Sequence, residues 1–412
     1  MIRILLVEDE QEKRRMLTEV ILSVEGVIRE RIEFAGDALE AKKCIKKKIY
    51  DLVILDINLP ERAECLPAVG GGLAVLHFIK NNDQAKPPGF LVGMTAFDNG
   101  EEVAQSEFSS PIWKLVRFSY QSDEWKKPLQ EAVKYLISAK RPPFANDGFS
   151  YHVDVAIFTA LQEEADSFLN MDIEWKLLEV QHDSGTYYQG RLTDGERSIS
   201  AVLAVAPQMG MPTAAVVASK IIHSFRPRIL AVAGICAGVR GKTKIGDILV
   251  ADPCFDWGGG KWIRDLNSGQ LAFLPAAYQW RLDESIRSIA SGLSRNTKLL
   301  DDMFAEFHGK AKGEPPCVYV NAMASGASVL QAATLMSDVR EQHKNLIGLE
   351  MESYAIFTAA ELASNPRPLC VAVKSVCDFG DESKADDAHR YAAYTSARFV
   401  CELALQIVGR VV

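Results

Sequence analysis

Residues 228–238 read RILAVAGICAG, an apolar run that ends in alanine and glycine. A strand buried in a parallel sheet has this pattern, because helices cover both faces of the sheet and leave no face for polar side chains. Similar runs precede and follow it: VDVAIFTA (153–160), SISAVLAVA (198–206), GDILVAD (246–252), CVYVNAMASG (317–326) and PLCVAVKSVCDFG (368–380). Helical periodicity covers Ala214–Phe225, Leu349–Leu362 and Ala388–Val408. The pattern predicts an α/β domain over residues 152–412.

The N-terminal part repeats this alternation on a smaller scale. Its apolar runs are ILLV, LVIL, FLVGM and KLVRF, and its amphipathic stretches are Glu10–Val24, Leu73–Asn81, Glu101–Ser106 and Ser122–Ile137. This order predicts a second parallel sheet covered by helices, over residues 1–139. Residues 140–151, KRPPFANDGFSY, carry two prolines and an Asn-Asp-Gly turn signal, so we expect a linker there.

Composition argues against several classes of function. The formal net charge is −8 and no long basic cluster is present, which argues against a nucleic-acid partner. No apolar stretch approaches the roughly 20 residues of a membrane helix, and no signal-peptide pattern is present, so we expect a cytoplasmic protein with no membrane partner. The eight cysteines lack CxxC spacing, so we expect neither a disulfide nor a zinc site.

Polar residues stand at the ends of the N-terminal strands. Glu8 and Asp9 follow the first strand, Asp56 ends another, and Thr95 ends the run that begins FLVGM. The carboxyl ends of parallel strands meet at one edge of a sheet. Carboxylates that lie close together there repel one another, and a hard cation such as Mg²⁺ would neutralise them. Asp56 is then placed to form an aspartyl phosphate. Each acid alone also suits the start of a helix, but the four residues together favour a site.

The motifs LLVEDE, DLVILDINLP and GMTA resemble the receiver domain of two-component response regulators, over Met1 to Ser138. The resemblance implies a flavodoxin-like fold with a five-stranded parallel sheet, and a sensor histidine kinase or phosphotransfer protein as partner. It also implies the site roles: Mg²⁺ held by Glu8, Asp9, Asp56 and the backbone carbonyl of Asn58, phosphorylation of Asp56, and a switch hydroxyl on Thr95.

One departure from the receiver pattern bears on mechanism. The family has a lysine followed by proline at the end of its fifth strand, whereas KLVRF here continues into residues 119–121, which read SYQ. The pair Lys127 and Pro128 lies later, in a stretch with helical periodicity. The lysine that contacts the phosphoryl group in the family is therefore unassigned by the sequence.

Acidic residues also follow the strands of the C-terminal part. Glu164 lies in TALQEEA (159–165), Glu352 in GLEMESYAI (348–356) and Asp378 in VKSVCDFGD (373–381). Release of adenine from ribose needs an activated water, a stabilised oxocarbenium-like sugar and an acid at N7, and these three residues are candidates in that order. Each alone also suits a helix start, where the helix dipole favours acids. Together they favour an active site.

These motifs, with AVAGICAGVRGKTKIGDILVAD (231–252) and SGASVL (325–330), resemble the nucleoside phosphorylase and nucleosidase family. Within it, they resemble the methylthioadenosine/S-adenosylhomocysteine nucleosidases, over Asp154 to Val408. The resemblance implies a larger α/β domain with a mixed central sheet and a purine nucleosidase that needs no cofactor. It implies a site with catalytic Glu164, Glu352 and Asp378, and with substrate contacts from Met351, Glu350, Leu330, Val329 and Gly234. Val329 stands where nucleosidases often have phenylalanine, and Cys377 replaces a usual serine.

The residues leave several substrates open. Gln162 to Glu164 stand where phosphorylases hold phosphate with an arginine, so the resemblance favours hydrolysis. The fusion resembles effectors of antiphage two-component systems, which release adenine from ATP, and Lys261 in FDWGGGKW (255–262) is the candidate triphosphate contact. The alternatives are a regulated methylthioadenosine/S-adenosylhomocysteine nucleosidase and a non-catalytic nucleotide-binding module. We expect a homo-oligomer in each case.

Overall fold

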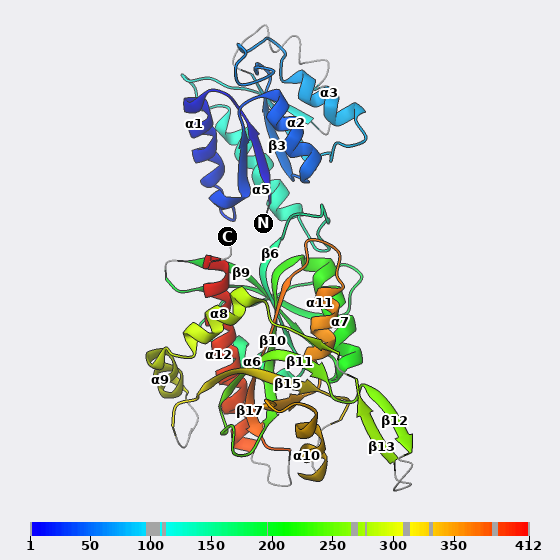
Figure 1. Ribbon diagram of the computed structural model, residues 1–412. Helices are drawn as coiled ribbons and strands as arrows, with labels where there is room; N and C mark the ends of the chain where they lie inside the picture. Colours follow the sequence, from blue (N-terminus) through cyan, green and yellow to red (C-terminus); the bar gives the residue numbers. More distant parts are fainter. Residues whose placement is uncertain are drawn as a thin grey trace. The chain divides into compact units, whose positions relative to one another are not determined.

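The computed structural model describes residues 2–95, 108, 113–195, 197–264, 271–276, 278–307, 314–328, 333–380 and 386–410. The chain forms two compact units (Figure 1). One comprises Met1–Arg141 with Ala145–Ser150, and the other comprises Pro142–Phe144 with Tyr151–Val412. The expected helix at Glu101–Ser106 lies outside the described residues. No helix of the described part is long and apolar enough to cross a membrane.

The N-terminal unit contains a five-stranded parallel sheet with the strand order β2-β1-β3-β4-β5. Its strands are β1 (Ile4–Val7), β2 (Ile32–Ala35), β3 (Leu52–Asp56), β4 (Phe90–Thr95) and β5 (Trp113–Arg117). Its helices are α1 (Gln11–Leu22), α2 (Ala38–Lys47), α3 (Leu73–Asn81), α5 (Lys126–Ala139) and the 3₁₀ turn η1 (Arg29–Arg31). The expected parallel sheet is therefore present.

Both faces of this sheet are buried, as the continuous apolar runs predict. Alternate residues of a strand point to opposite faces. Ile4 and Leu6 of β1 belong to a hydrophobic cluster with residues of α1 and α5, whereas Leu5 and Val7 belong to a cluster with residues of α2 and α3. All four side chains are fully buried, and burial of each contributes about 1.5–3 kcal/mol.

Part of the expected linker belongs to the N-terminal unit. The carboxylate of Asp147 is buried, and it accepts hydrogen bonds from Arg3 Nη1 at 2.8 Å and from the backbone N–H of Ser150 at 2.8 Å. Lys86 Nζ donates to the backbone carbonyl of Asp147 at 2.7 Å. Residues 145–150 are thus fixed to this unit, while residues 142–144 belong to the other.

The C-terminal unit is built on a ten-stranded mixed sheet, with a separate two-stranded hairpin of β12 (Gly260–Arg264) and β13 (Leu271–Pro275). The strands of the large sheet are β6 (Val153–Thr159), β7 (Lys176–Leu177), β8 (Thr186–Thr193), β9 (Ser198–Val205), β10 (Pro227–Gly238), β11 (Ile248–Asp256), β14 (Gln279–Trp280), β15 (Val318–Ser325), β16 (Gly348–Glu350) and β17 (Leu369–Asp378). Five of them pair in a closed ring, in the order β10-β17-β11-β15-β16 and back to β10.

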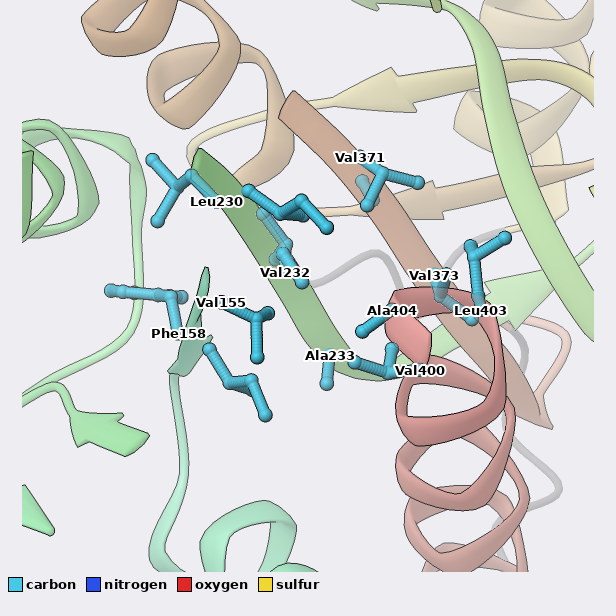
Figure 2. Packing of buried hydrophobic residues seen from close by; sticks show 14 of the residues in the cluster. Val155, Phe158, Leu230, Val232, Ala233, Val371, Val373, Val400, Leu403 and Ala404 are labelled. Atoms are coloured by element: carbon cyan, nitrogen blue, oxygen red, sulfur yellow. The ribbon is translucent and has the colours of Figure 1, made fainter. Parts of the chain in front are cut away.

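The helices of this unit are α6 (Gln162–Leu169), α7 (Met211–Phe225), α8 (Glu284–Leu293), α9 (Thr297–Glu306), α10 (Ala333–Gln342), α11 (Ser353–Glu361) and α12 (Asp386–Arg410). Helix α12 packs on β10 and β17 and also contacts α6 and α8, while α7 and α11 pack against each other. Figure 2 shows Val400, Leu403 and Ala404 of α12 facing the aliphatic side chains of β10 and β17. This core fixes the ends of β6, β10 and β17 relative to one another.

One sequence prediction is wrong at its start. A helix was expected over Leu349–Leu362, but residues 348–350 form strand β16 and the helix α11 begins at Ser353. The carboxylate of Glu350 explains the break, because it accepts hydrogen bonds from the backbone N–H groups of Glu352 and Ser353, both at 2.9 Å. The Glu350 side chain therefore stabilises a turn at a position where the apolar periodicity alone predicts a helix.

Candidate active site

Hydrogen bonds hold the carboxylate of Glu164 in place just after β6. It lies in the first turn of α6, and its Oε2 accepts hydrogen bonds from the backbone N–H groups of Ala160 at 2.8 Å and Leu161 at 3.0 Å. Its Oε1 accepts from the N–H of Ile235, on β10, at 2.9 Å. Three backbone donors therefore hold one buried carboxylate in a single orientation.

Gly234 allows β10 to approach this carboxylate. A Cβ atom at position 234 would lie 2.0 Å from Glu164 Oε1, which is too close for any side chain. The N–H of Gly234 donates to Ser396 Oγ of α12 at 2.8 Å. Gly234 therefore acts through the position of Glu164.

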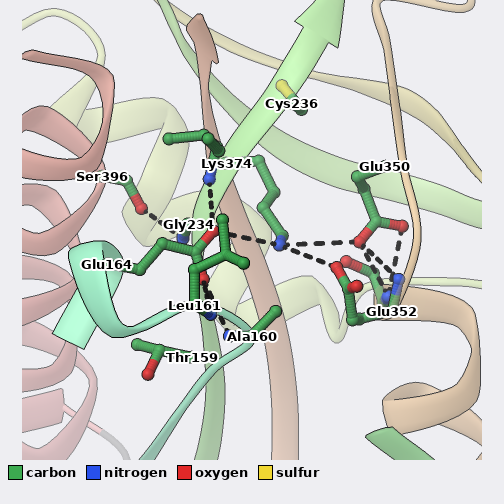
Figure 3. A network of polar contacts seen from close by, with 12 residues as sticks. Thr159, Ala160, Leu161, Glu164, Gly234, Cys236, Glu350, Glu352, Lys374 and Ser396 are labelled. Carbon is green, nitrogen blue, oxygen red and sulfur yellow. Dashed lines mark hydrogen bonds and ion pairs between the residues drawn. The ribbon is translucent and has the colours of Figure 1, made fainter. Parts of the chain in front are cut away.

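Lys374 lies at the centre of the site and was not singled out by the sequence. It belongs to β17, is 1% exposed, and its Nζ lies 3.2 Å from Glu352 Oε2, 3.8 Å from Glu350 Oε2 and 3.9 Å from Glu164 Oε1. Figure 3 shows its ammonium group between Glu164 on one side and the Glu350 and Glu352 pair on the other. One cation thus stabilises three carboxylates that would otherwise repel one another.

Glu352 and Glu350 have different surroundings. Glu352 Oε1 accepts a hydrogen bond from the backbone N–H of Gly210 at 2.9 Å, and its Oε2 accepts from Lys374. Both oxygens of Glu350 are already bonded, to the hydroxyl of Ser325 and to the turn that begins α11. Glu350 therefore holds Glu352 in position, and its expected role as a direct substrate contact stays a prediction.

Asp378 ends β17 on the same side of the sheet. Its Oδ1 accepts from the N–H of Gly380 at 2.8 Å, and Cys377 Sγ lies 3.6 Å from its Oδ2. Potential ligand atoms of Cys377, Asp378 and His389 lie within 4.8 Å of one another. Burial raises the pKa of the Cys377 thiol.

A cavity of about 210 Å³ brings these residues together. Its lining includes the carboxylates Glu164, Glu352 and Asp378, together with Met351 and Glu350. The rest of the lining is Ala160, Leu161, Met209, Ile235, Cys236, Ala237, Trp257, Ser328, Leu349, Cys377 and His389. Three carboxylates from distant parts of the chain therefore face one largely apolar space, which is the arrangement that the sequence predicted.

The structure does not bring every expected residue to this cavity. Lys261 lies exposed on β12, outside the cavity lining. Val329 and Leu330 lie outside the described residues. Among the described residues that line the cavity, His389 is the one basic side chain. Lys261 therefore does not line this cavity, and its expected contact with a triphosphate stays a prediction.

Burial and charge set the protonation of the site. Burial raises the pKa of Glu164, and the nearby Lys374 ammonium opposes that change. Burial raises the pKa of Glu350 as well. Burial alone would lower the pKa of Lys374, but Glu164, Glu352 and Glu350 raise it above its ordinary value. Lys374 therefore carries a positive charge. A further proton that binds to this site goes to one of the carboxylates.

A second group of carboxylates lies in the N-terminal unit. Glu8, Asp9 and Asp56 place ligand atoms within 4.8 Å of one another at the carboxyl ends of β1 and β3. Burial raises the pKa of Glu8 to about 7 and also raises that of Asp56. Thr95 ends the neighbouring strand β4 and is fully buried. Asn58 lies two residues after Asp56, and its Oδ1 accepts from Gly70 N–H at 3.3 Å.

The family model of the phosphorylase superfamily matches residues 154–409. The chain belongs to the phosphorylase superfamily. The matched residues contain β6 from its second residue, β10, β17 and the whole carboxylate site. The expected nucleosidase-family fold of the C-terminal unit is thereby confirmed.

Three relatives extend this assignment. The protein y4jS of Sinorhizobium fredii is 29% identical over 418 residues, which cover 100% of this chain and 99% of that protein. The ATP nucleosidase Cap17 of Escherichia coli is 21% identical over 48% of this chain and 40% of its own length. The 5'-methylthioadenosine/S-adenosylhomocysteine nucleosidase of Maridesulfovibrio salexigens is 23% identical over 60% of this chain and 97% of its own length. The predicted enzyme class, a purine nucleosidase type of hydrolase, is confirmed.

Proposed function

We propose that the C-terminal unit hydrolyses the N-glycosidic bond of an adenine nucleotide, with ATP as the first candidate substrate. The observation that carries the proposal is the convergence of Glu164, Glu352 and Asp378 on one cavity, with Lys374 among the carboxylates. The relative Cap17 supports ATP as the candidate.

The three carboxylates divide the reaction between them. Glu164 accepts a proton from water, whose oxygen forms the new bond to C1' of the sugar. The bond between C1' and N9 breaks, its electron pair goes to adenine, and Asp378 delivers a proton to N7. Glu352 accepts hydrogen bonds from the ribose hydroxyls, and these strengthen as positive charge grows on the sugar. The products are adenine and a free sugar phosphate.

Charge around Glu164 supports water as the nucleophile. The start of α6 carries Glu163 and Glu164 in its first turn, and the described cavity lining has no arginine to hold phosphate. A phosphate dianion next to a buried carboxylate is strongly disfavoured, whereas a neutral water molecule is not. This supports hydrolysis over phosphorolysis.

A second candidate substrate is methylthioadenosine or S-adenosylhomocysteine. The apolar lining, with His389 as its one described basic side chain, favours a sugar that carries no triphosphate. The relative from Maridesulfovibrio salexigens, matched over 97% of its length, supports the same substrate. We keep ATP as the first candidate substrate because destruction of ATP is harmful to the cell, and an enzyme with such an activity needs a regulatory domain.

The N-terminal unit is, in our proposal, a receiver that controls this enzyme through phosphorylation of Asp56, in a cytoplasmic antiphage response. The donor set fits Mg²⁺, since Glu8, Asp9 and Asp56 offer three carboxylates and Lys13 balances one of their charges. A divalent cation held there would balance the two negative charges that remain, and it would also bind an oxygen of the incoming phosphoryl group. A histidine kinase or phosphotransfer protein is the proposed donor, and a homo-oligomer the proposed active form.

The enzymatic proposal is tested by incubating the full chain with ATP, AMP, methylthioadenosine and S-adenosylhomocysteine, each with and without acetyl phosphate and Mg²⁺. Free adenine is measured by chromatography, with a Glu164→Gln variant as the blank. Adenine from ATP supports the first candidate, and adenine from methylthioadenosine alone selects the second. No adenine from any substrate overturns the proposal and leaves a non-catalytic nucleotide-binding module.

The receiver proposal is tested separately, by the intact mass of the protein after treatment with acetyl phosphate and Mg²⁺. An added phosphoryl group that is absent in Asp56→Asn supports it. The same mass change after treatment in wild type and Asp56→Asn contradicts it.

A further inference from the structure

Lys13 is a buried lysine with no role in the reaction described above. It lies in the first turn of α1, and only 2% of the residue is exposed. Its Nζ lies 2.8 Å from Glu8 Oε2 and 3.0 Å from Asp56 Oδ2. A buried ammonium group is costly unless it is paired, so this position is specified by the two carboxylates.

We infer that Lys13 is the cation that binds the phosphoryl group on Asp56, in place of a lysine after β5. The inference rests on the proposed receiver function of the N-terminal unit. Lys13 reaches the site from a helix, whereas the receiver pattern supplies its lysine from the end of a strand.

Strand β5 ends at Arg117, and no lysine lies between Arg117 and Lys126. Phe118 follows β5, is buried, and donates its N–H to Thr95 O at 2.8 Å. The Nζ of Lys13 lies 5.3 Å from the centre of the Phe118 ring. Tyr120 turns its hydroxyl to Glu10 Oε1. Aromatic residues therefore follow β5 at positions 118 and 120, and the ammonium group of Lys13 lies over the ring of Phe118.

The contacts also account for the transfer step. A carboxylate oxygen of Asp56 attacks phosphorus, the bond from phosphorus to the leaving oxygen of acetyl phosphate breaks, and acetate departs with that electron pair. Asp56 loses its own negative charge when it becomes an acyl phosphate, and the phosphoryl oxygens carry the charge instead. Lys13 can follow that charge from the carboxylate to a phosphoryl oxygen while it keeps its pair with Glu8.

This placement names the element that responds to phosphorylation. Lys13 belongs to α1, which packs against α5. Any shift of its ammonium group from Asp56 toward a phosphoryl oxygen therefore acts on α1 directly, and through α1 on α5.

The test compares full-length wild type with Lys13→Met, using Lys43→Met, an exposed lysine of α2, as the matched control. Phosphorylation by acetyl phosphate and Mg²⁺ is followed by intact mass. Affinity for beryllofluoride, a phosphoryl analogue, is measured from the change in tryptophan fluorescence, to which Trp125 contributes, since its ring centre lies 4.9 Å from that of Phe118. We expect Lys13→Met to lower both the rate and the affinity by at least about tenfold, with the control unchanged.

A second pair of variants keeps the test decisive if Lys13→Met does not fold. Glu8→Gln is compared with Glu8→Gln/Lys13→Met, because the double variant leaves fewer unpaired carboxylates. Loss of rate and of beryllofluoride affinity on adding Lys13→Met supports the inference in either background. The double variant Lys13→Met/Ser119→Lys moves the positive charge from α1 to the segment after β5. Recovery of the phosphorylation rate in this variant gives further support.

The failures of the two proposals are distinguishable. A wild type that takes up no phosphoryl group at Asp56 contradicts the receiver function itself. A wild type that is phosphorylated, beside folded Lys13 variants with the rate and affinity of their parents, overturns the assignment of Lys13 alone.

Discussion

The two units solve the same electrostatic problem with different elements. In each, one buried lysine stabilises a group of carboxylates at strand ends: Lys13 with Glu8 and Asp56, and Lys374 with Glu164, Glu350 and Glu352. Lys13 comes from a helix that covers its sheet. Lys374 comes from β17, which is paired with β10 on one side and β11 on the other.

The difference teaches what each cluster is suited to do. A helix can shift against a sheet by small sliding motions, so a lysine on α1 can follow a charge that changes place. A lysine held in a strand with neighbours on both sides keeps its position, which favours a preorganised site whose charges do not rearrange during the reaction. The first cluster is suited to a switch and the second to catalysis.

The largest effect is expected from Glu164→Gln. Glutamine keeps the volume but cannot accept a proton from water, so adenine release should fall by about 10³-fold. Glu163→Gln is the matched control, because Glu163 is the preceding residue and its side chain is 41% exposed. Steady-state kinetics on the best substrate give both values, and equal rates for the two variants would remove Glu164 from the mechanism.

Lys374→Met is expected to be next in effect. It leaves three buried carboxylates without their cation, and breaking a buried ion pair in this way costs about 3–5 kcal/mol of stability. Lys13→Met should cost less, because Lys13 is paired with two carboxylates and Lys374 with three. Urea denaturation of both variants measures the two losses. A larger loss for Lys13→Met would contradict the contrast drawn between the units.

Gly234→Ala should have a smaller but clear effect on activity. The added Cβ would meet Glu164 Oε1, so the carboxylate must shift, and a displacement of this kind costs about 10²-fold in rate. Gly292→Ala is the control, since nothing lies within 4 Å of its added Cβ in α8, and there alanine should stabilise the helix by about 0.5–1 kcal/mol. Retained activity in Gly234→Ala would show that the orientation of Glu164 is not critical.

The smallest effect concerns pH. Glu164 must be ionised to accept a proton, and burial raises its pKa above the ordinary 4.5. The kcat/KM profile should therefore fall as pH decreases, from a higher pH than an exposed glutamate would give. Lys374→Met removes the positive charge beside Glu164, so the fall of kcat/KM at low pH should begin at a still higher pH. Lys374→Arg keeps the charge and should leave this fall near its wild-type position. A fall that moves to lower pH in Lys374→Met would exclude Glu164 as the titrating group.

Much of both sites could be predicted because their acids are adjacent to strands. Glu8, Asp56, Glu164 and Asp378 each stand within a few residues of an apolar run, and strand order in parallel sheets brings such ends together. The two lysines could not be predicted in the same way. Lys13 stands in the sequence EKRR, which is typical of an exposed helix, and its two partners lie on strand ends.

Lys374 and Glu350 show the same limit for the larger unit. Lys374 interrupts the apolar run VAVKSV, and only the fold brings Glu164, more than 200 positions earlier, to its side chain. Glu350 lies in a helical pattern, yet its carboxylate ends that pattern by binding two backbone N–H groups. In both places a long-range or side-chain interaction outweighs local periodicity.

The burial of Asp147 sets a practical limit on how this protein is divided. Its pairing with Arg3 and its contact with Lys86 attach residues 145–150 to the N-terminal unit. A truncation after Lys140 would remove Asp147 and leave the buried Arg3 guanidinium without that carboxylate, at a cost of about 3–5 kcal/mol. Isolated preparations of this half should therefore extend through Ser150.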